Sequence, residues 1–210
     1  MIDLLPSILV NTERAFRSQL KMMSGVAKTI HLDVLDETFV PFRSWADPEI
    51  IKTIGTPCTF EVHLMVQHPE KYLEAWMNLP QTIRLIWHVE TPDDHHALAQ
   101  ECHHHAREAG LAINPHTPKI ALDPFADILD EILIMGVEPG SSGQPLLMDT
   151  VKKAREIHDR FPKILLGFDG GVSNTSIPFL KDAGITRFCA ASAIFANDLP
   201  KKAFKQLQEM

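Results

Sequence analysis

Two apolar segments decide the fold: Glu131-Ile132-Leu133-Ile134-Met135-Gly136-Val137 and Lys163-Ile164-Leu165-Leu166-Gly167-Phe168. Each is short and continuously apolar at its centre, as expected of strands buried on both faces of a parallel sheet. Between them, apolar residues recur at helix spacing at Val151, Ala154, Ile157 and Phe161. A strand, a helix and a second strand in this order predict a parallel pair joined by a crossover.

This alternation extends over the whole chain. It predicts eight strands, at Leu4–Leu9, Thr29–Val34, Thr59–Leu64, Ile83–His88, Gly110–Asn114, Glu131–Val137, Lys163–Phe168 and Ile185–Cys189. Ser173 is expected to cap a helix that buries Ile177, Leu180 and Ala183 and ends at Gly184. Gly110 is expected to end one helix and begin a strand.

The length of the chain then limits the possible architectures. Eight β/α units need about 200 residues, and the chain has 210. We therefore predict an α/β fold with one domain over residues 1–210, a (β/α)8 TIM barrel. A doubly wound open sheet is the alternative.

Composition excludes several classes of partner. The net charge is −7, with 45% hydrophobic and 22% charged residues, and no strongly basic stretch predicts a nucleic-acid or anionic-membrane surface. Residues 1–6 lack the pattern of a signal peptide, and no apolar run approaches the roughly 18 residues of a membrane span. Three cysteines suggest no disulfide framework. We expect a cytoplasmic protein that binds neither nucleic acid nor membrane.

Polar residues gather where the predicted strands end. His31 and Asp33 are two residues apart and point the same way, His63 ends the third strand, and Asp169 follows the seventh. In a (β/α)8 barrel these ends meet at one face, where active sites lie. Imidazole and carboxylate ligands suit Zn²⁺, Fe²⁺, Mn²⁺ or Co²⁺. The four side chains predict a site for one divalent metal ion.

Three loops suit a phosphorylated ligand. Gly170-Gly171 follows the seventh strand, and Ala191-Ser192 follows the eighth. Loops at these two places commonly bind phosphate through backbone N–H groups. A third loop, Gly140 to Gln144, follows the sixth strand.

In order and spacing, these segments resemble the ribulose-phosphate 3-epimerase family. The resemblance rests on Pro6-Ser7-Ile8-Leu9, His31-Leu32-Asp33-Val34-Leu35-Asp36, Phe39-Val40-Pro41, His63-Leu64-Met65-Val66, Asn114-Pro115, Thr117-Pro118, Val137-Glu138-Pro139-Gly140, Gly143-Gln144, Asp169-Gly170-Gly171-Val172 and Ser192-Ala193-Ile194-Phe195.

The resemblance implies an isomerase that inverts C3 of a ketose phosphate through an enediolate. It implies that Asp33 and Asp169 transfer the proton on opposite faces of the substrate and also bind the metal with His31 and His63. It further implies substrate contacts at Ser7, Met65, Met135, Gly140, Gly143 and Gln144, and phosphate contacts at Gly170, Gly171, Ala191 and Ser192. Members of the family often self-associate, so a homo-oligomer is expected.

Several positions depart from the family pattern. Leu35 replaces a methionine and Phe42 an asparagine, Ser141-Ser142 replace a Phe-Gly pair, and Ala191 replaces a phosphate-loop glycine. Glu37 replaces a glycine, which predicts a strained positive φ and places a carboxylate near the metal site.

These departures leave the substrate open. D-ribulose 5-phosphate is the leading candidate, D-allulose 6-phosphate is a second, and a catalytically weak phosphosugar-binding barrel is a third. Related decarboxylase and synthase barrels carry an Asp-x-Lys-x-x-Asp cluster, which the segment around His31 and Asp33 lacks. The histidines at 95, 96, 103, 104 and 105 could suggest a second metal site, but we expect them to form a solvated helix face.

Overall fold

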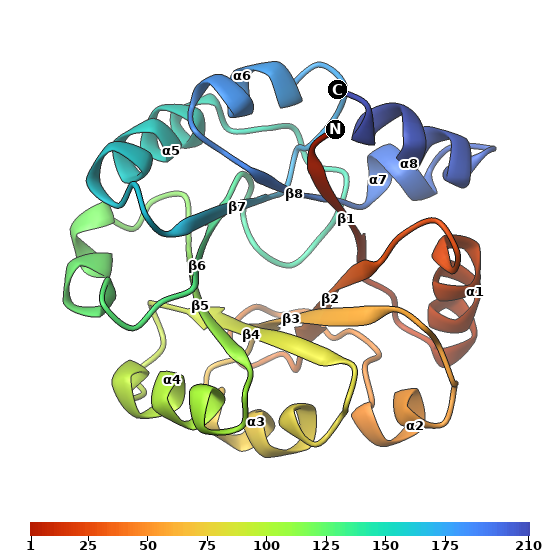
Figure 1. The fold of residues 1–210 in the computed structure, drawn as a ribbon, viewed down its shortest axis with the longest axis horizontal. Coiled ribbons are helices and arrows are strands. Elements are labelled where there is room, and N and C mark those ends of the chain that lie inside the picture. The colour runs from red at the N-terminus through yellow and green to blue at the C-terminus, as the bar shows by residue number, and fades with distance from the viewer.

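Eight parallel strands close into a barrel in the computed structural model, which describes residues 1–210 (Figure 1). The strands are β1 (Asp3–Ile8), β2 (Thr29–Leu35), β3 (Thr59–Met65), β4 (Thr82–His88), β5 (Glu108–Ile113), β6 (Glu131–Met135), β7 (Leu165–Asp169) and β8 (Arg187–Ala190). Pairing of β1 with β8, at Leu4 opposite Phe188 and Pro6 opposite Ala190, completes the ring. Closure confirms the predicted barrel and rules out the open sheet.

Helices surround the barrel on the outside (Figure 1). They are α1 (Glu13–Met23), α2 (Pro48–Lys52), α3 (Glu70–Met77), α4 (His95–His104), α5 (Met148–Arg160), α6 (Ile177–Asp182), α7 (Ser192–Phe195) and α8 (Pro200–Gln208), with a 3₁₀ helix, η1 (Lys119–Phe125), after β5. No helix is both long and apolar enough to cross a membrane.

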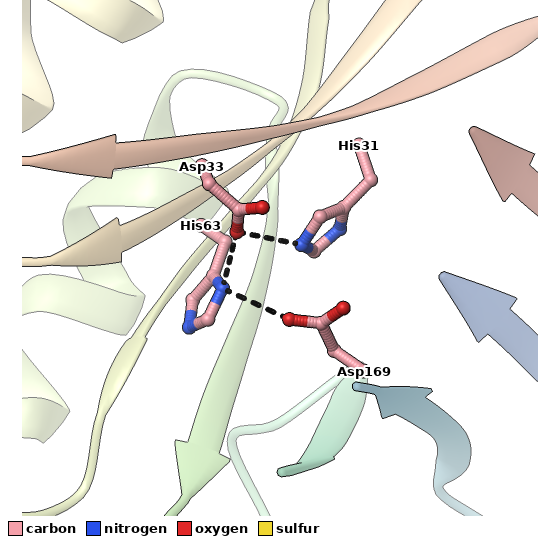
Figure 2. Close-up of side chains that lie close together, drawn as sticks. All are labelled: His31, Asp33, His63 and Asp169. Atoms are coloured by element: carbon pink, nitrogen blue, oxygen red, sulfur yellow. Dashed lines mark hydrogen bonds and ion pairs between the residues drawn. The ribbon is translucent and has the colours of Figure 1, made fainter. Parts of the chain in front are cut away.

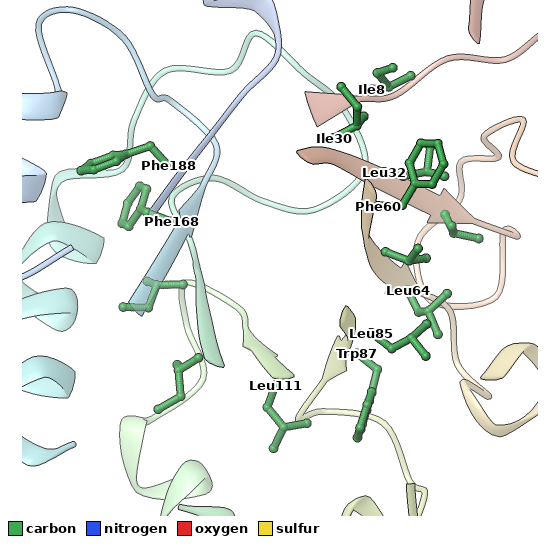
Figure 3. Packing of buried hydrophobic residues seen from close by; sticks show 14 of the residues in the cluster. Ile8, Ile30, Leu32, Phe60, Leu64, Leu85, Trp87, Leu111, Phe168 and Phe188 are labelled. Carbon is green, nitrogen blue, oxygen red and sulfur yellow. The ribbon is translucent and has the colours of Figure 1, made fainter. Parts of the chain in front are cut away.

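Alternate residues of each strand face opposite sides of the barrel wall. Outward-facing side chains such as Ile30, Leu32, Phe60 and Leu64 are fully buried between strands and helices (Figure 3). The inward-facing residues of the same strands include His31, Asp33 and His63. Strands β2 and β3 are therefore apolar on one face only.

The barrel interior is charged at the end where the strands begin, which is called the lower end here. Glu61, Arg84, Glu131 and Arg187, here called the ionic floor, come from four different strands, and their side chains contact one another across the barrel. Glu61 and Glu131 have no exposed surface, and Arg84 retains 4%. Strands of a buried parallel sheet are usually apolar, and these four positions depart from that pattern.

Two predicted helix boundaries are corrected. Helix α6 buries Ile177 and Leu180 and is followed by Gly184 at φ +91°, as expected, but it begins at Ile177, four residues beyond Ser173. Ser173 lies in the turn before the helix, where its Oγ accepts from the N–H of Ser176 at 3.3 Å and its carbonyl from the N–H of Ile177 at 3.0 Å.

Gly110 lies inside β5 and ends no helix. Helix α4 ends at His104 and is closed by Ala106, whose φ is +54°. The N–H of Ala106 donates to the His103 carbonyl and that of Arg107 to the Cys102 carbonyl, which is the Schellman pattern of helix ends. Glycine usually occupies this left-handed position because a Cβ is disfavoured there.

Ala106→Gly should therefore stabilise the protein. Removing the Cβ relieves the left-handed strain, and we expect urea unfolding to show a gain of about 0.5–1 kcal/mol. Ala97→Gly, on the exposed side of the same helix, is the matched control and should cost about 0.5–1 kcal/mol. Equal destabilisation by both variants would contradict the assignment of strain to Ala106.

Candidate active site and metal centre

Four side chains predicted to bind a metal converge at the C-terminal end of the barrel (Figure 2). Asp33 Oδ1 lies 3.0 Å from His63 Nδ1 and 3.3 Å from His31 Nε2, and Asp169 Oδ2 lies 4.0 Å from His63 Nδ1. One donor atom from each residue lies within 4.8 Å of the others. Three strands thus bring two nitrogens and two oxygens around one point.

Strand register explains the convergence. Asp33 and His63 are direct partners across β2 and β3, and His31 is one inward-facing step below Asp33. Asp169 is the last residue of β7 and approaches from the other side of the barrel (Figure 2). His31 and His63 have no exposed surface, and Asp33 retains 4%.

The two carboxyl groups differ in acidity. Burial alone would raise the pKa of Asp33, but the adjacent His31 and His63 outweigh burial and hold that pKa well below its usual range. Burial, and then the negative charge of Asp33, raise the pKa of Asp169 to about 6. Two neighbouring carboxyl groups with opposite shifts suit an acid and a base acting on one molecule.

The donor set fits a divalent cation. His31 Nε2 is buried and has no hydrogen-bond partner, although it points at the carboxylates. Two imidazoles and two carboxylates are ligands typical of zinc and the neighbouring transition metals.

The outer nitrogen of His63 is also engaged. Its Nε2 lies 3.0 Å from His88 Nε2, and His88 Nδ1 lies 3.2 Å from Glu90 Oε2. Burial lowers the pKa of His88 to about 4, so this ring is neutral near pH 7. A neutral His88 that donates to Glu90 can accept from His63 Nε2–H, which would leave the Nδ1 lone pair of His63 free for a cation bound between this ring and the carboxylates.

A cavity opens directly above the four side chains. Asp33 and Asp169 line it together with every residue predicted to contact substrate or phosphate: Ser7, Met65, Met135, Gly140, Gly143, Gln144, Gly170, Gly171, Ala191 and Ser192. Ser7 Oγ donates to Asp33 Oδ2 at 2.7 Å, which orients that carboxylate. Gln144 Nε2 donates to the carbonyls of Glu138 and Ser141, so its amide nitrogen also holds the loop after β6.

The two glycines after β7 have positive φ angles, which residues with a Cβ rarely adopt. Gly170 and Gly171 have φ of +97° and +68°. A Cβ on Gly170 would lie 2.4 Å from a methyl carbon of Val137. Ala191, by contrast, has φ −104°, so its extra methyl group causes no strain of this kind.

Glu37 adopts the predicted positive φ, +73°. Its carboxylate accepts from Arg43 at 2.8 and 3.0 Å in an exposed ion pair and does not line the cavity. The carboxylate expected near the metal site is therefore paired with an arginine and lies outside the cavity lining. Phe42 packs against Gly140, where a Cβ would approach its ring to 2.5 Å.

The histidine-rich helix is exposed only in part. His96, His103, His104 and His105 are exposed as expected, but His95 is buried. His95 Nδ1 accepts from Trp87 Nε1 at 3.0 Å because its position in the first turn of α4 faces β4.

Sequence reasoning missed four polar residues around the metal-binding side chains: Glu61, His88, Glu90 and Cys189. The strongest missed signal was Glu61-Val62-His63, where two polar residues alternate with an apolar one inside a strand. His88 and Glu90 show the same spacing across the end of β4.

Comparisons with known proteins agree with this geometry. Residues 3–195 match the model of the ribulose-phosphate 3-epimerase family. The chain is 32% identical to the ribulose-phosphate 3-epimerase of Bacillus subtilis (strain 168), with 99% of both chains covered. It is 32% identical to that of Escherichia coli (strain K12), covering 97% of this chain and 93% of the relative.

Solved structures support the fold alone. A 3-hexulose-6-phosphate synthase superposes with a TM-score of 0.69 at 14% identity, covering 100% of this chain and 99% of that one. A mutant tryptophan synthase alpha-subunit from Pyrococcus furiosus gives 0.70 at 12% identity, covering 100% of this chain and 97% of that one. The family match and the full-length relatives carry the assignment: the chain belongs to the ribulose-phosphate 3-epimerase family of isomerases.

Proposed function

We propose that this protein interconverts D-ribulose 5-phosphate and D-xylulose 5-phosphate by inverting C3, with one divalent metal ion (Zn, Fe, Mn or Co) held by His31, Asp33, His63 and Asp169. The observation that carries the proposal is the pair Asp33 and Asp169, which line one cavity with pKa values shifted in opposite directions. The names of the full-length relatives support the choice of a pentulose phosphate.

Each carboxyl group has a defined part in the proposal. Ionised Asp33 accepts the C3 proton from one face, and protonated Asp169 donates a proton to the other face. In the reverse direction the two exchange roles. A bound divalent cation would supply positive charge against the negative charge that develops on the substrate oxygens.

The remaining cavity residues orient the substrate. The backbone of Gly170, Gly171, Ala191 and Ser192 is proposed to bind the phosphate, since these positions surround the cavity after β7 and β8. Met65 and Met135, each 2% exposed, also line the cavity and would exclude water from the reacting carbons.

A second candidate substrate is a six-carbon ketose phosphate such as D-allulose 6-phosphate. The observation in its favour is that Ser141 and Ser142, which replace a Phe-Gly pair, line the cavity. A substrate panel separates the two candidates by their kcat/KM values, and turnover of any member excludes a merely sugar-binding barrel. Self-association of the chain stays a prediction.

Removing either carboxylate should abolish epimerisation. In metal-loaded protein, Asp33→Asn and Asp169→Asn should each lower kcat by about 10²–10⁴-fold or more, because each loses both an acid–base group and a metal ligand. A coupled assay for xylulose 5-phosphate measures this, and Asp198→Asn, an exposed carboxylate, is the control. Full activity in either site variant would disprove the two-aspartate mechanism.

Metal binding should weaken as the pH falls. The pKa of Asp169 in the metal-free protein is raised to about 6, so below that pH a cation must compete with a proton for its carboxyl group. Calorimetric titration with Co²⁺ should therefore show proton release and a falling affinity below about pH 6. In Asp169→Asn this step near pH 6 should vanish, and an unchanged profile would contradict the assignment.

A further inference from the structure

The ionic floor contains one carboxylate that reaches the metal site. Glu61 Oε1 lies 2.7 Å from His31 Nδ1, and neither side chain has any exposed surface. Cys189 Sγ packs 3.3 Å from the same nitrogen. His31 Nδ1 is therefore engaged by Glu61 and Cys189, while Nε2 makes no hydrogen bond and lies 3.3 Å from Asp33 Oδ1.

We propose that Glu61 is a positioning residue: it fixes the ring orientation and tautomer of His31 so that Nε2 is presented to the metal ion. This inference rests on the metal site of the proposed function. A carboxylate that accepts from Nδ1–H leaves the lone pair on Nε2, the atom that faces Asp33 and Asp169. If the proton were on Nε2, His31 could not act as a ligand there.

Two arginines hold Glu61 in place. Its other oxygen, Oε2, accepts from Arg84 Nη1 and, at 2.9 Å, from Arg187 Nη1. These cations come from β4, the neighbour of β3, and from β8, which β1 and β2 separate from β3 in the closed ring. A fully buried carboxylate needs such pairing to be tolerated, and the two guanidinium groups also fix its direction.

Glu131 shows that the contact with His31 is specific to Glu61. It too is fully buried, and its Oε2 lies 2.8 Å from both Arg84 and Arg187. No hydrogen bond joins Glu131 to His31. The two glutamates therefore share the same arginines, but only Glu61 touches a metal-binding side chain, which makes Glu131 a matched control.

The test compares Co²⁺ affinity in stripped wild-type, Glu61→Gln and Glu131→Gln proteins by competition with a chromogenic chelator. Glu61→Gln should weaken binding by about 10–100-fold, as loss of a carboxylate behind a ligating histidine typically does. Glu131→Gln should stay near the wild-type value. Equal losses in the two variants, or no loss in Glu61→Gln, would overturn the proposal. Failure of the wild type to bind Co²⁺ would instead overturn the metal site itself.

A second measurement needs no floor variant and covers the case in which Glu61→Gln does not fold. In ¹⁵N-histidine-labelled wild-type protein loaded with Zn²⁺, the His31 ring signals can be assigned by their absence from His31→Asn. Nδ1 should carry the proton and Nε2 the metal. Protonated Nε2, or metal on Nδ1, would refute the positioning role of Glu61.

Discussion

Closure of the eight-stranded ring is the constraint from which the rest of the structure follows. Once β1 pairs with β8, every strand has one face toward the helices and one toward the barrel interior. The outward faces form the apolar core. The inward faces form successive layers, with the ionic floor below, the metal-binding side chains above it and the cavity above those. A residue's chemistry is therefore set by its position along a strand as much as by its type.

The layers also differ in charge. The floor places two arginines beneath a site rich in carboxylates, and burial makes each ion depend on its partners. Glu61 belongs to both layers, since one of its oxygens contacts arginine and the other histidine. Asp33 has a similar position higher up, held by Ser7 and by both histidines.

Sequence was sufficient to predict the barrel and the convergence of four polar side chains, because His31, Asp33, His63 and Asp169 interrupt apolar strands at one end. It was insufficient for the ionic floor: Arg84 and Arg187 stand near strand starts, where charges are usually solvated, and their partners lie across a ring that only closure creates. His95 was misjudged because its neighbours in sequence are exposed. Ala106 gave no signal, since alanine rarely closes a helix in a left-handed conformation.

The ionic floor also has an evolutionary consequence. Removing one member of a buried ion network leaves the others unpaired and costs several kcal/mol, whereas replacing the whole set with apolar residues is often nearly neutral. We therefore expect strong epistasis among positions 61, 84, 131 and 187, so that the four residues are inherited as a set. A lineage could gain or lose this set only through less stable intermediates, so it would persist long after neighbouring surface positions had diverged.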